Sequence, residues 1–156
     1  MNIDIVCVGK LKERFWADAC AEYLKRLRPY AKVQVTELPD IDPARAGGEA
    51  QARAQEGERI LDVLPEGAHV IALAIDGKQR TSVEFSQHID ELAVRGTSDI
   101  AFVIGGSTGL APAVLERADE KLSFGAITLP HNLARVVLLE QLYRAFKISR
   151  HEPYHK

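Results

Sequence analysis

The sequence predicts an α/β fold, with a mainly parallel sheet and helices on both of its faces. Short apolar runs alternate with stretches of helical periodicity along the whole chain, the order typical of strand–helix–strand units. Two of the runs, His69–Ile75 and Ile100–Ile104, are apolar almost without interruption. Strands of a parallel sheet show this pattern because helices cover both of their faces.

In the first half of the chain, proline and glycine mark where elements end. Pro29 stops one predicted helix, and Pro65 with Gly67 closes another. We expect a strand over Asn2–Val8, a helix over Arg14–Arg28, a strand over Val33–Leu38, a loose segment over Asp40–Gly48 and a helix over Glu49–Leu64.

The second half continues the alternation. Asp76-Gly77 is expected to turn the chain after the strand His69–Ile75. Thr81 and Glu84 have the spacing of a capping box, which opens a helix. That helix is expected to reach Val94, followed by a strand over Ile100–Ile104, a helix from Pro112 to Ala118, a last strand over Ser123–Leu129 and a last helix over Asn132–Ile148. No repeat or linker divides the chain, so one domain is expected over residues 1–156.

The composition is that of a soluble globular protein. The chain has 156 residues, of which 46% are apolar and 27% charged. No apolar run is long enough to span a membrane, and the N-terminal run carries Asp4 and no cleavage pattern, so we expect neither a membrane segment nor a signal peptide. Cys7 and Cys20 stand alone among apolar neighbours, which predicts buried thiols in a reducing cytoplasm.

Charge is distributed unevenly. The net charge is −2, but residues 10–32 hold seven Lys/Arg against three Asp/Glu and residues 122–156 hold five against two. Residues 37–66 hold three against eight. A phosphate-binding face built from the two basic ends is possible, yet RNA affinity would need specific recognition or a second copy of the chain.

A glycine turn, Gly105-Gly106-Ser107-Thr108-Gly109-Leu110, directly follows a buried strand. Ligands of open α/β sheets bind beyond the carboxyl ends of strands, where glycines let the backbone approach a ligand. The turn lacks the Lys-Ser/Thr of a P-loop and the spacing of a dinucleotide fingerprint. It predicts either a site contacted mainly by backbone or merely a tight connection.

The last predicted helix is apolar on two sides, which indicates that it is buried on two sides, and another subunit is the expected partner of the second side. Arg135 falls within the apolar arc, where it needs an anion or carbonyl partner unless it escapes at the helix start. Glu140 and Arg144 are four residues apart, the spacing of an ordinary surface ion pair.

The histidines near the C-terminus have several possible roles. His131 follows Pro130 at a strand-to-helix corner and can simply cap the helix. His151 and His155 suggest zinc, but no cysteine or carboxylate cluster supplies further ligands, so we expect no metal. Tyr154 and His155 can donate hydrogen bonds, accept a proton or stack on a base, unless the end of the chain is disordered.

Five motifs together make the chain recognisable. They are the opening IVCVGKLKE, the VIGGSTGL turn, the SFGAITLPH corner, the RVVLLEQLYRAFKI helix and the closing PYHK. In this order they closely resemble the RlmH-type ribosomal RNA large-subunit pseudouridine methyltransferases of the SPOUT class, over essentially the whole chain.

The resemblance implies transfer of a methyl group from S-adenosylmethionine to N3 of a pseudouridine in large-subunit (23S) ribosomal RNA, on assembled ribosomes. It also implies a homodimer and a C-terminal trefoil knot, which periodicity alone would never suggest. The family's cofactor positions map onto Leu73, Gly105, Phe124, Gly125, Ala126, Ile127, Thr128 and Leu129.

Methyl transfer to N3 requires loss of its proton, and the developing anion favours a nearby cation or donor. The candidates are Arg135, Arg144, Tyr154, His155 and His131, with Glu140 positioning one arginine. Two other functions compete: a non-catalytic ribosome-associated binding protein, and a nucleotide-binding hydrolase, which the missing phosphate motifs disfavour.

Overall fold

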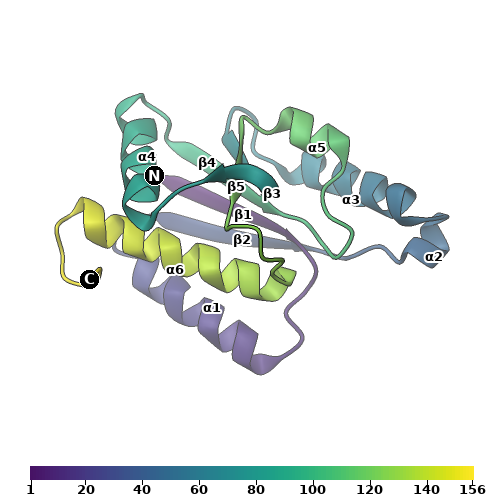
Figure 1. Ribbon diagram of the computed structural model, residues 1–156, viewed down its shortest axis with the longest axis horizontal. Coiled ribbons are helices and arrows are strands. Elements are labelled where there is room, and N and C mark those ends of the chain that lie inside the picture. The colour runs from purple at the N-terminus through teal and green to yellow at the C-terminus, as the bar shows by residue number, and fades with distance from the viewer.

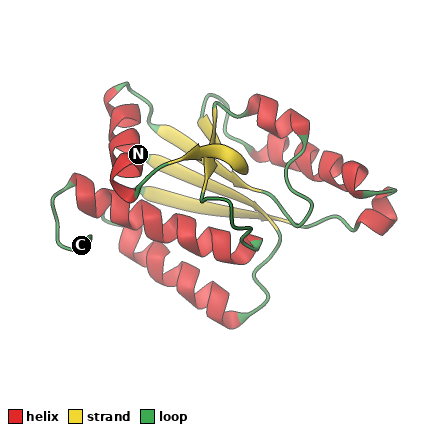
Figure 2. Cartoon of the chain, viewed as in Figure 1, coloured by secondary structure: helices red, strands yellow, loops and turns green.

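The computed structural model describes residues 1–156 and contains one sheet of five strands, all of them parallel. The strand order is β2-β1-β4-β3-β5, and Figure 2 shows the strands as a central layer between helices. The strands are β1 (Asn2–Val8), β2 (Lys32–Leu38), β3 (His69–Gln79), β4 (Asp99–Ile104) and β5 (Glu120–Ser123). The predicted fold class is confirmed.

Helices cover both faces of this sheet (Figure 1). The first face carries α1 (Arg14–Leu27), α4 (Ser82–Val94) and α6 (His131–Ser149). The second face carries α3 (Glu49–Val63) and α5 (Pro112–Arg117), and the short α2 (Pro43–Ala46) lies beside α3. Strand side chains alternate between two cores because successive residues point to opposite faces. Ile3 and Ile5 of β1 join the first core, whereas Val6 and Val8 join the second.

The predicted turn at Asp76-Gly77 is wrong, because β3 continues through it to Gln79. The strand bends instead, and Leu73 and Lys78 both pair with Leu122 of β5 across an irregularity in the register. A Cβ atom on Gly77 would lie 2.7 Å from the carbonyl carbon of Lys121. Glycine at this position therefore permits close contact between two backbones and does not reverse the chain.

The predicted last strand over Ser123–Leu129 is also wrong. Strand β5 spans Glu120–Ser123, and residues 124–130 form a loop. Gly125 has φ +111°, a left-handed conformation incompatible with a strand. The Ser123 hydroxyl accepts a hydrogen bond from the Gly125 N–H at 3.1 Å and lies 3.0 Å from the carbonyl oxygen of Ile75, to which it donates.

The loose segment Asp40–Gly48 contains one short helix that the sequence did not reveal. Asp42 caps α2 by accepting a hydrogen bond from the Ala44 N–H at 3.0 Å, and Pro43 occupies its first turn. The other predicted elements agree with the structure to within one residue at each end, and the capping box of Thr81 and Glu84 is confirmed.

Cys7 and Cys20 are buried free thiols, as predicted. None of the helices combines the length and apolar character needed to cross a membrane. The trefoil knot implied by the resemblance stays a prediction.

Candidate active site

A cavity of about 770 Å³ opens at the carboxyl ends of β3 and β4. Its walls come from the end of β3, the glycine turn after β4, the loop 124–130 and the start of α6. Seven of the eight predicted cofactor positions line it, namely Leu73, Gly105, Phe124, Gly125, Ile127, Thr128 and Leu129. Ala126 lies in the same loop but is not among the lining residues. Three segments distant in the sequence thus meet in one cavity: the end of β3, the glycine turn, and the loop 124–130 with the start of α6.

The walls are largely apolar, and two large side chains at this cavity are exposed. Ile75 is 62% exposed and Ile127 is 80% exposed. Asp76 adds a carboxylate, which pairs with Lys121 at 3.0 Å. The sequence analysis did not assign Ile75 and Asp76 to the site, because it ended the strand at Ile75 and interpreted Asp76-Gly77 as a turn. Their place at the end of a buried apolar run was a usable signal.

The glycine turn both connects tightly and lines the cavity. The Gly109 N–H donates to the Gly106 carbonyl at 3.1 Å, and Gly109 has φ +83°. A Cβ atom on Gly105 would lie 3.0 Å from the carbonyl group of Gly109. A side chain at Gly105 would therefore strain the turn itself before it met any ligand.

The loop 124–130 presents unpaired peptide groups. The N–H groups of residues 126–129 donate no hydrogen bond within the protein, whereas that of Gly125 bonds Ser123. Ile127, Thr128 and Leu129 line the cavity. A polar ligand edge placed there would find backbone donors that the fold leaves free.

His131 lies at the junction of the cavity and α6. Its side chain makes no capping hydrogen bond, so the interpretation as a helix cap is wrong. The ring packs against Gly9, where a Cβ atom would lie 2.6 Å from Cε1, and Gly9 has φ +109°. The buried Nδ1 of His131 has no protein partner.

Arg135 points into the protein and is 2% exposed. Its Nη1 donates to a Glu37 carboxylate oxygen at 2.7 Å, and its Nη2 donates to the Gly9 carbonyl at 3.0 Å. Burial disfavours the Glu37 carboxylate, but the hydrogen bonds from Arg135 and the Leu11 N–H outweigh it and lower the pKa of Glu37. Arg135 does not line the cavity and does not escape to solvent at the helix start.

The remaining four candidates form one cluster at the other end of α6, here called the tail cluster: Glu140, Arg144, Tyr154 and His155. Arg144 donates to Glu140 from Nη2 at 2.5 Å and from Nε at 3.0 Å. The Tyr154 hydroxyl donates to the same Glu140 oxygen at 3.1 Å, and its ring lies 4.7 Å from the Arg144 guanidinium. Arg144 Nη1 lies 3.2 Å from His155 Nδ1. The chain end is therefore tied to α6.

The protonation states of the tail cluster follow from these contacts. Burial, then the neighbouring Tyr23 and Glu140, raises the pKa of Tyr154 to about 12. The hydrogen bond with Glu140 raises the pKa of Arg144. Because a guanidinium only donates, His155 Nδ1 must accept from it. Arg144 and Tyr154 thus donate to one carboxylate, that of Glu140, and His155 accepts from Arg144.

The structure does not bring all six catalytic candidates together. His131 and Arg144 are separated along α6 by about 20 Å, at about 1.5 Å per residue. No residue of the tail cluster lines the cavity at the start of the same helix.

Comparisons with known proteins show the family to which the chain belongs. A family model described as "Predicted SPOUT methyltransferase" matches residues 1–155. The chain is 56% identical to the protein named Ribosomal RNA large subunit methyltransferase H of Listeria monocytogenes serotype 4b, over 159 residues and 100% of both chains. It is 55% identical to the proteins of that name from Listeria welshimeri and Bacillus thuringiensis, again over 100% of both chains. The chain belongs to the SPOUT methyltransferase family.

Proposed function

We propose that the protein transfers the methyl group of S-adenosylmethionine to N3 of a pseudouridine in 23S ribosomal RNA, acting on assembled ribosomes. The names of its full-length relatives support the ribosomal RNA substrate, and the five sequence motifs support the pseudouridine. The single observation that carries the proposal is the cavity where the predicted cofactor positions meet.

The cavity fits S-adenosylmethionine on three grounds. Its volume of about 770 Å³ lies within the range of small-molecule sites, roughly 300–1,000 Å³. Apolar walls from Leu73, Phe124 and Leu129 suit a flat adenine ring. The unpaired peptide N–H groups of residues 126–129 suit its hydrogen-bonding edge. Ala126 would then act through its backbone only.

Thr128→Trp tests the cavity directly, because Thr128 is exposed and its enlargement crowds no core. We expect calorimetric titration with S-adenosylmethionine to show one site per chain in the wild type and strongly weakened binding in Thr128→Trp. Ala126→Ser, in the same loop but away from the lining, is the matched control and should bind normally. Equal affinity of Thr128→Trp and wild type would place the cofactor elsewhere.

The chemistry then divides between the two ends of α6. S-adenosylmethionine supplies an activated methyl group, so the protein mainly holds N3 in line with it and excludes water. Arg144 and Tyr154 both carry protons and donate, which suits an anion developing at N3. Glu140 orients both groups. The N3 proton then passes to solvent or to His131, which lines the cavity.

A homodimer resolves the separation of about 20 Å between cavity and tail cluster along α6. Leu133, Val137, Arg144 and Ile148 recur at four- and seven-residue spacing on α6, and the three apolar ones pack against neither core. Such a stripe suits a second copy of the chain. In a symmetric dimer built on α6, the tail cluster of each protomer serves the cavity of the other.

Mixing two inactive variants tests this arrangement. Thr128→Trp destroys the cavity, and deletion of residues 153–156 removes the tail. If the site combines two protomers, half of the randomly mixed dimers hold one intact site, so about a quarter of wild-type methyl transfer returns. If the site lies within one protomer, no mixed dimer is active. A monomer in light scattering at micromolar concentration would also contradict the dimer.

The charge distribution supports an RNA face. Both basic ends of the chain lie on one side of the sheet, where α1 packs directly on α6 (Figure 1). The acidic segment 37–66 includes α2 and α3 on the opposite side. Two copies of the basic side bind RNA better than one chain of net charge −2. Binding to ribosomes should weaken with salt, but less steeply than for a strongly basic protein.

A further inference from the structure

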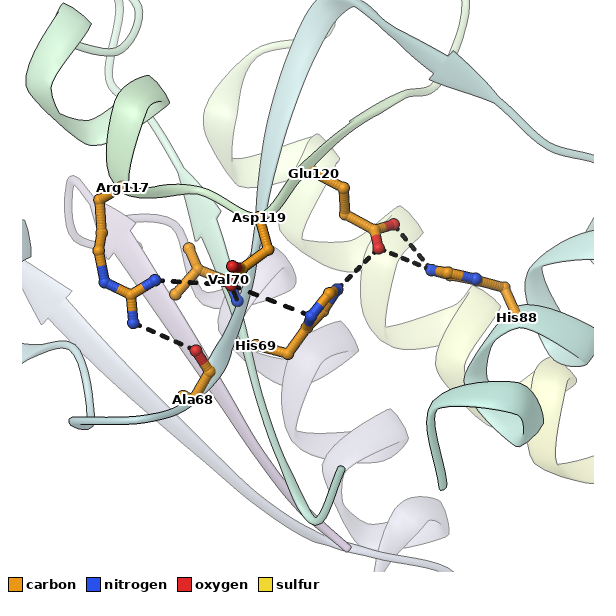
Figure 3. Close-up of polar contacts among 7 residues, drawn as sticks. All are labelled: Ala68, His69, Val70, His88, Arg117, Asp119 and Glu120. Carbon is orange, nitrogen blue, oxygen red and sulfur yellow. Dashed lines mark hydrogen bonds and ion pairs between the residues drawn. The ribbon is translucent and has the colours of Figure 1, made fainter. Parts of the chain in front are cut away.

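Two histidines converge on one carboxylate at the amino ends of the strands (Figure 3). His69 begins β3, Glu120 begins β5 and His88 lies on α4. His69 Nε2 lies 2.7 Å from a Glu120 oxygen, and His88 Nε2 lies 2.8 Å from both Glu120 oxygens. The three side chains are 15–23% exposed, so solvent reaches the cluster.

This cluster is separate from the candidate active site. Because β3 is parallel to its neighbours, its first residue lies at the opposite edge of the sheet from the cavity. His69 and Leu73 are four residues apart, or about 13 Å along a strand. None of the three residues lines the cavity.

A second set of residues supports His69. Its Nδ1 lies 3.9 Å from Asp119 Oδ2, on the side of the ring away from Glu120. Asp119 is fixed in turn, because its Oδ2 accepts the Val70 N–H at 2.7 Å and lies 3.5 Å from Arg117 Nη1. Arg117 Nη2 donates to the Ala68 carbonyl at 3.1 Å. Metal-binding histidines are held in this way, with the second ring nitrogen facing a carboxylate.

We propose that His69, His88 and Glu120 bind a zinc ion, with solvent at the fourth position. Two imidazoles and one carboxylate are a ligand set that zinc uses, whereas magnesium and calcium prefer oxygen alone. The ligand atoms all lie within 4.8 Å of one another. Tetrahedral zinc at about 2.0–2.1 Å needs ligands about 3.3 Å apart, so the present contacts of 2.7–2.8 Å open by about 0.6 Å.

Zinc here joins a helix to two strands that already pair with each other. It ties α4 to the first residues of β3 and β5. Strand β5 has only four residues and leads directly into the loop 124–130 at the cavity. Binding therefore stabilises the folded chain and the support of that loop, and it takes no part in methyl transfer.

The test is calorimetric titration of the full-length, chelator-treated protein with zinc chloride alone. We expect one zinc per chain and a higher melting temperature with zinc. Asp119→Asn should weaken binding by about 10- to 100-fold, and His88→Gln by more than that. His151→Gln removes an exposed histidine that is not part of the cluster and should change nothing. Cobalt(II) should give the absorption spectrum of a four-coordinate site.

Circular dichroism of each variant without metal identifies any that fails to fold, and Glu120→Gln then replaces it. Three results would overturn the proposal: no zinc binding by the wild type, equal affinity in folded His88→Gln and wild type, or loss of the site in His151→Gln. The last result would assign the zinc to the chain end.

Discussion

The buried ion pair between Arg135 and Glu37 makes the sharpest stability prediction. Glu37→Gln removes the negative charge but preserves the shape of the side chain. Arg135 then keeps its charge at 2% exposure, with only the Gly9 carbonyl and a neutral amide as acceptors. Leaving a buried charge without its partner costs about 3–5 kcal/mol when both groups are fully buried.

Here the cost is lower because the Glu37 side chain is 34% exposed. We expect a loss of about 2–3 kcal/mol in the free energy of unfolding, or about 5–10 °C in melting temperature for a chain of this size. Arg135→Met keeps an apolar stem but removes the charge. The double variant should therefore lose less than the sum of the two single variants.

Thermal and urea unfolding followed by circular dichroism measure these values. The pKa of Glu37 is lowered from its usual 4.5, so its stabilisation is complete above pH 4.5 and is lost as the pH falls through the lower, folded-state pKa. The difference in the free energy of unfolding between wild type and Glu37→Gln should therefore become smaller at acid pH. If Glu37→Gln lowers the free energy of unfolding by less than about 1 kcal/mol at pH 7, the pair does not anchor α6. A double variant whose loss equals the sum of the two single losses would contradict the pairing as well.

Three further variants test separate features. Gly77→Ala places a Cβ atom 2.7 Å from the β5 backbone. It should lower the free energy of unfolding by about 1–3 kcal/mol and weaken S-adenosylmethionine binding in calorimetry. Normal binding would contradict the close packing of β3 on β5. Tyr154→Phe loses the hydrogen bond to Glu140. Ribosome methylation should fall about ten-fold, and the free energy of unfolding should fall by about 1 kcal/mol. Unchanged methylation would mean that Tyr154 is structural only. Thr81→Ala removes the N-terminal cap of α4, so the free energy of unfolding should fall by about 1 kcal/mol. The affinity for the cofactor should stay unchanged, and a changed affinity would link the cap to the site.

The fold class could be predicted because it depends on local pattern. Buried parallel strands are apolar without alternation, and the Thr81 capping box acts within four residues. The two errors arose at glycines whose backbone role the residue pattern does not reveal. Gly77 lies against β5, more than forty residues later in the chain, so its role could not be distinguished from that of a turn. The stretch from Ser123 to Leu129 has strand-like residues, but Gly125 leaves the strand region.

The residues of the candidate site also divide into those with a local sequence signal and those that only the fold brings together. From the sequence alone, the glycine turn after a buried strand was either a ligand site or a tight connection, and the structure shows that it lines the cavity. The resemblance added the loop Phe124–Leu129. Arg135 was expected to need an anion or a carbonyl unless it escaped at the helix start, but its partner Glu37 lies 98 residues away and carries no local signal. The cluster of His69, His88 and Glu120 was missed for the same reason, since only the fold brings these three elements together.

Methyl transfer from labelled S-adenosylmethionine to ribosomes tests the proposed function most directly. We expect the wild-type protein to incorporate label into 23S ribosomal RNA, at N3 of a pseudouridine when the product nucleoside is identified. Thr128→Trp should incorporate little, and ribosomes whose RNA carries uridine at the target should accept none. Wild-type protein that binds S-adenosylmethionine yet leaves ribosomes unlabelled, or labels another atom, would contradict the proposal.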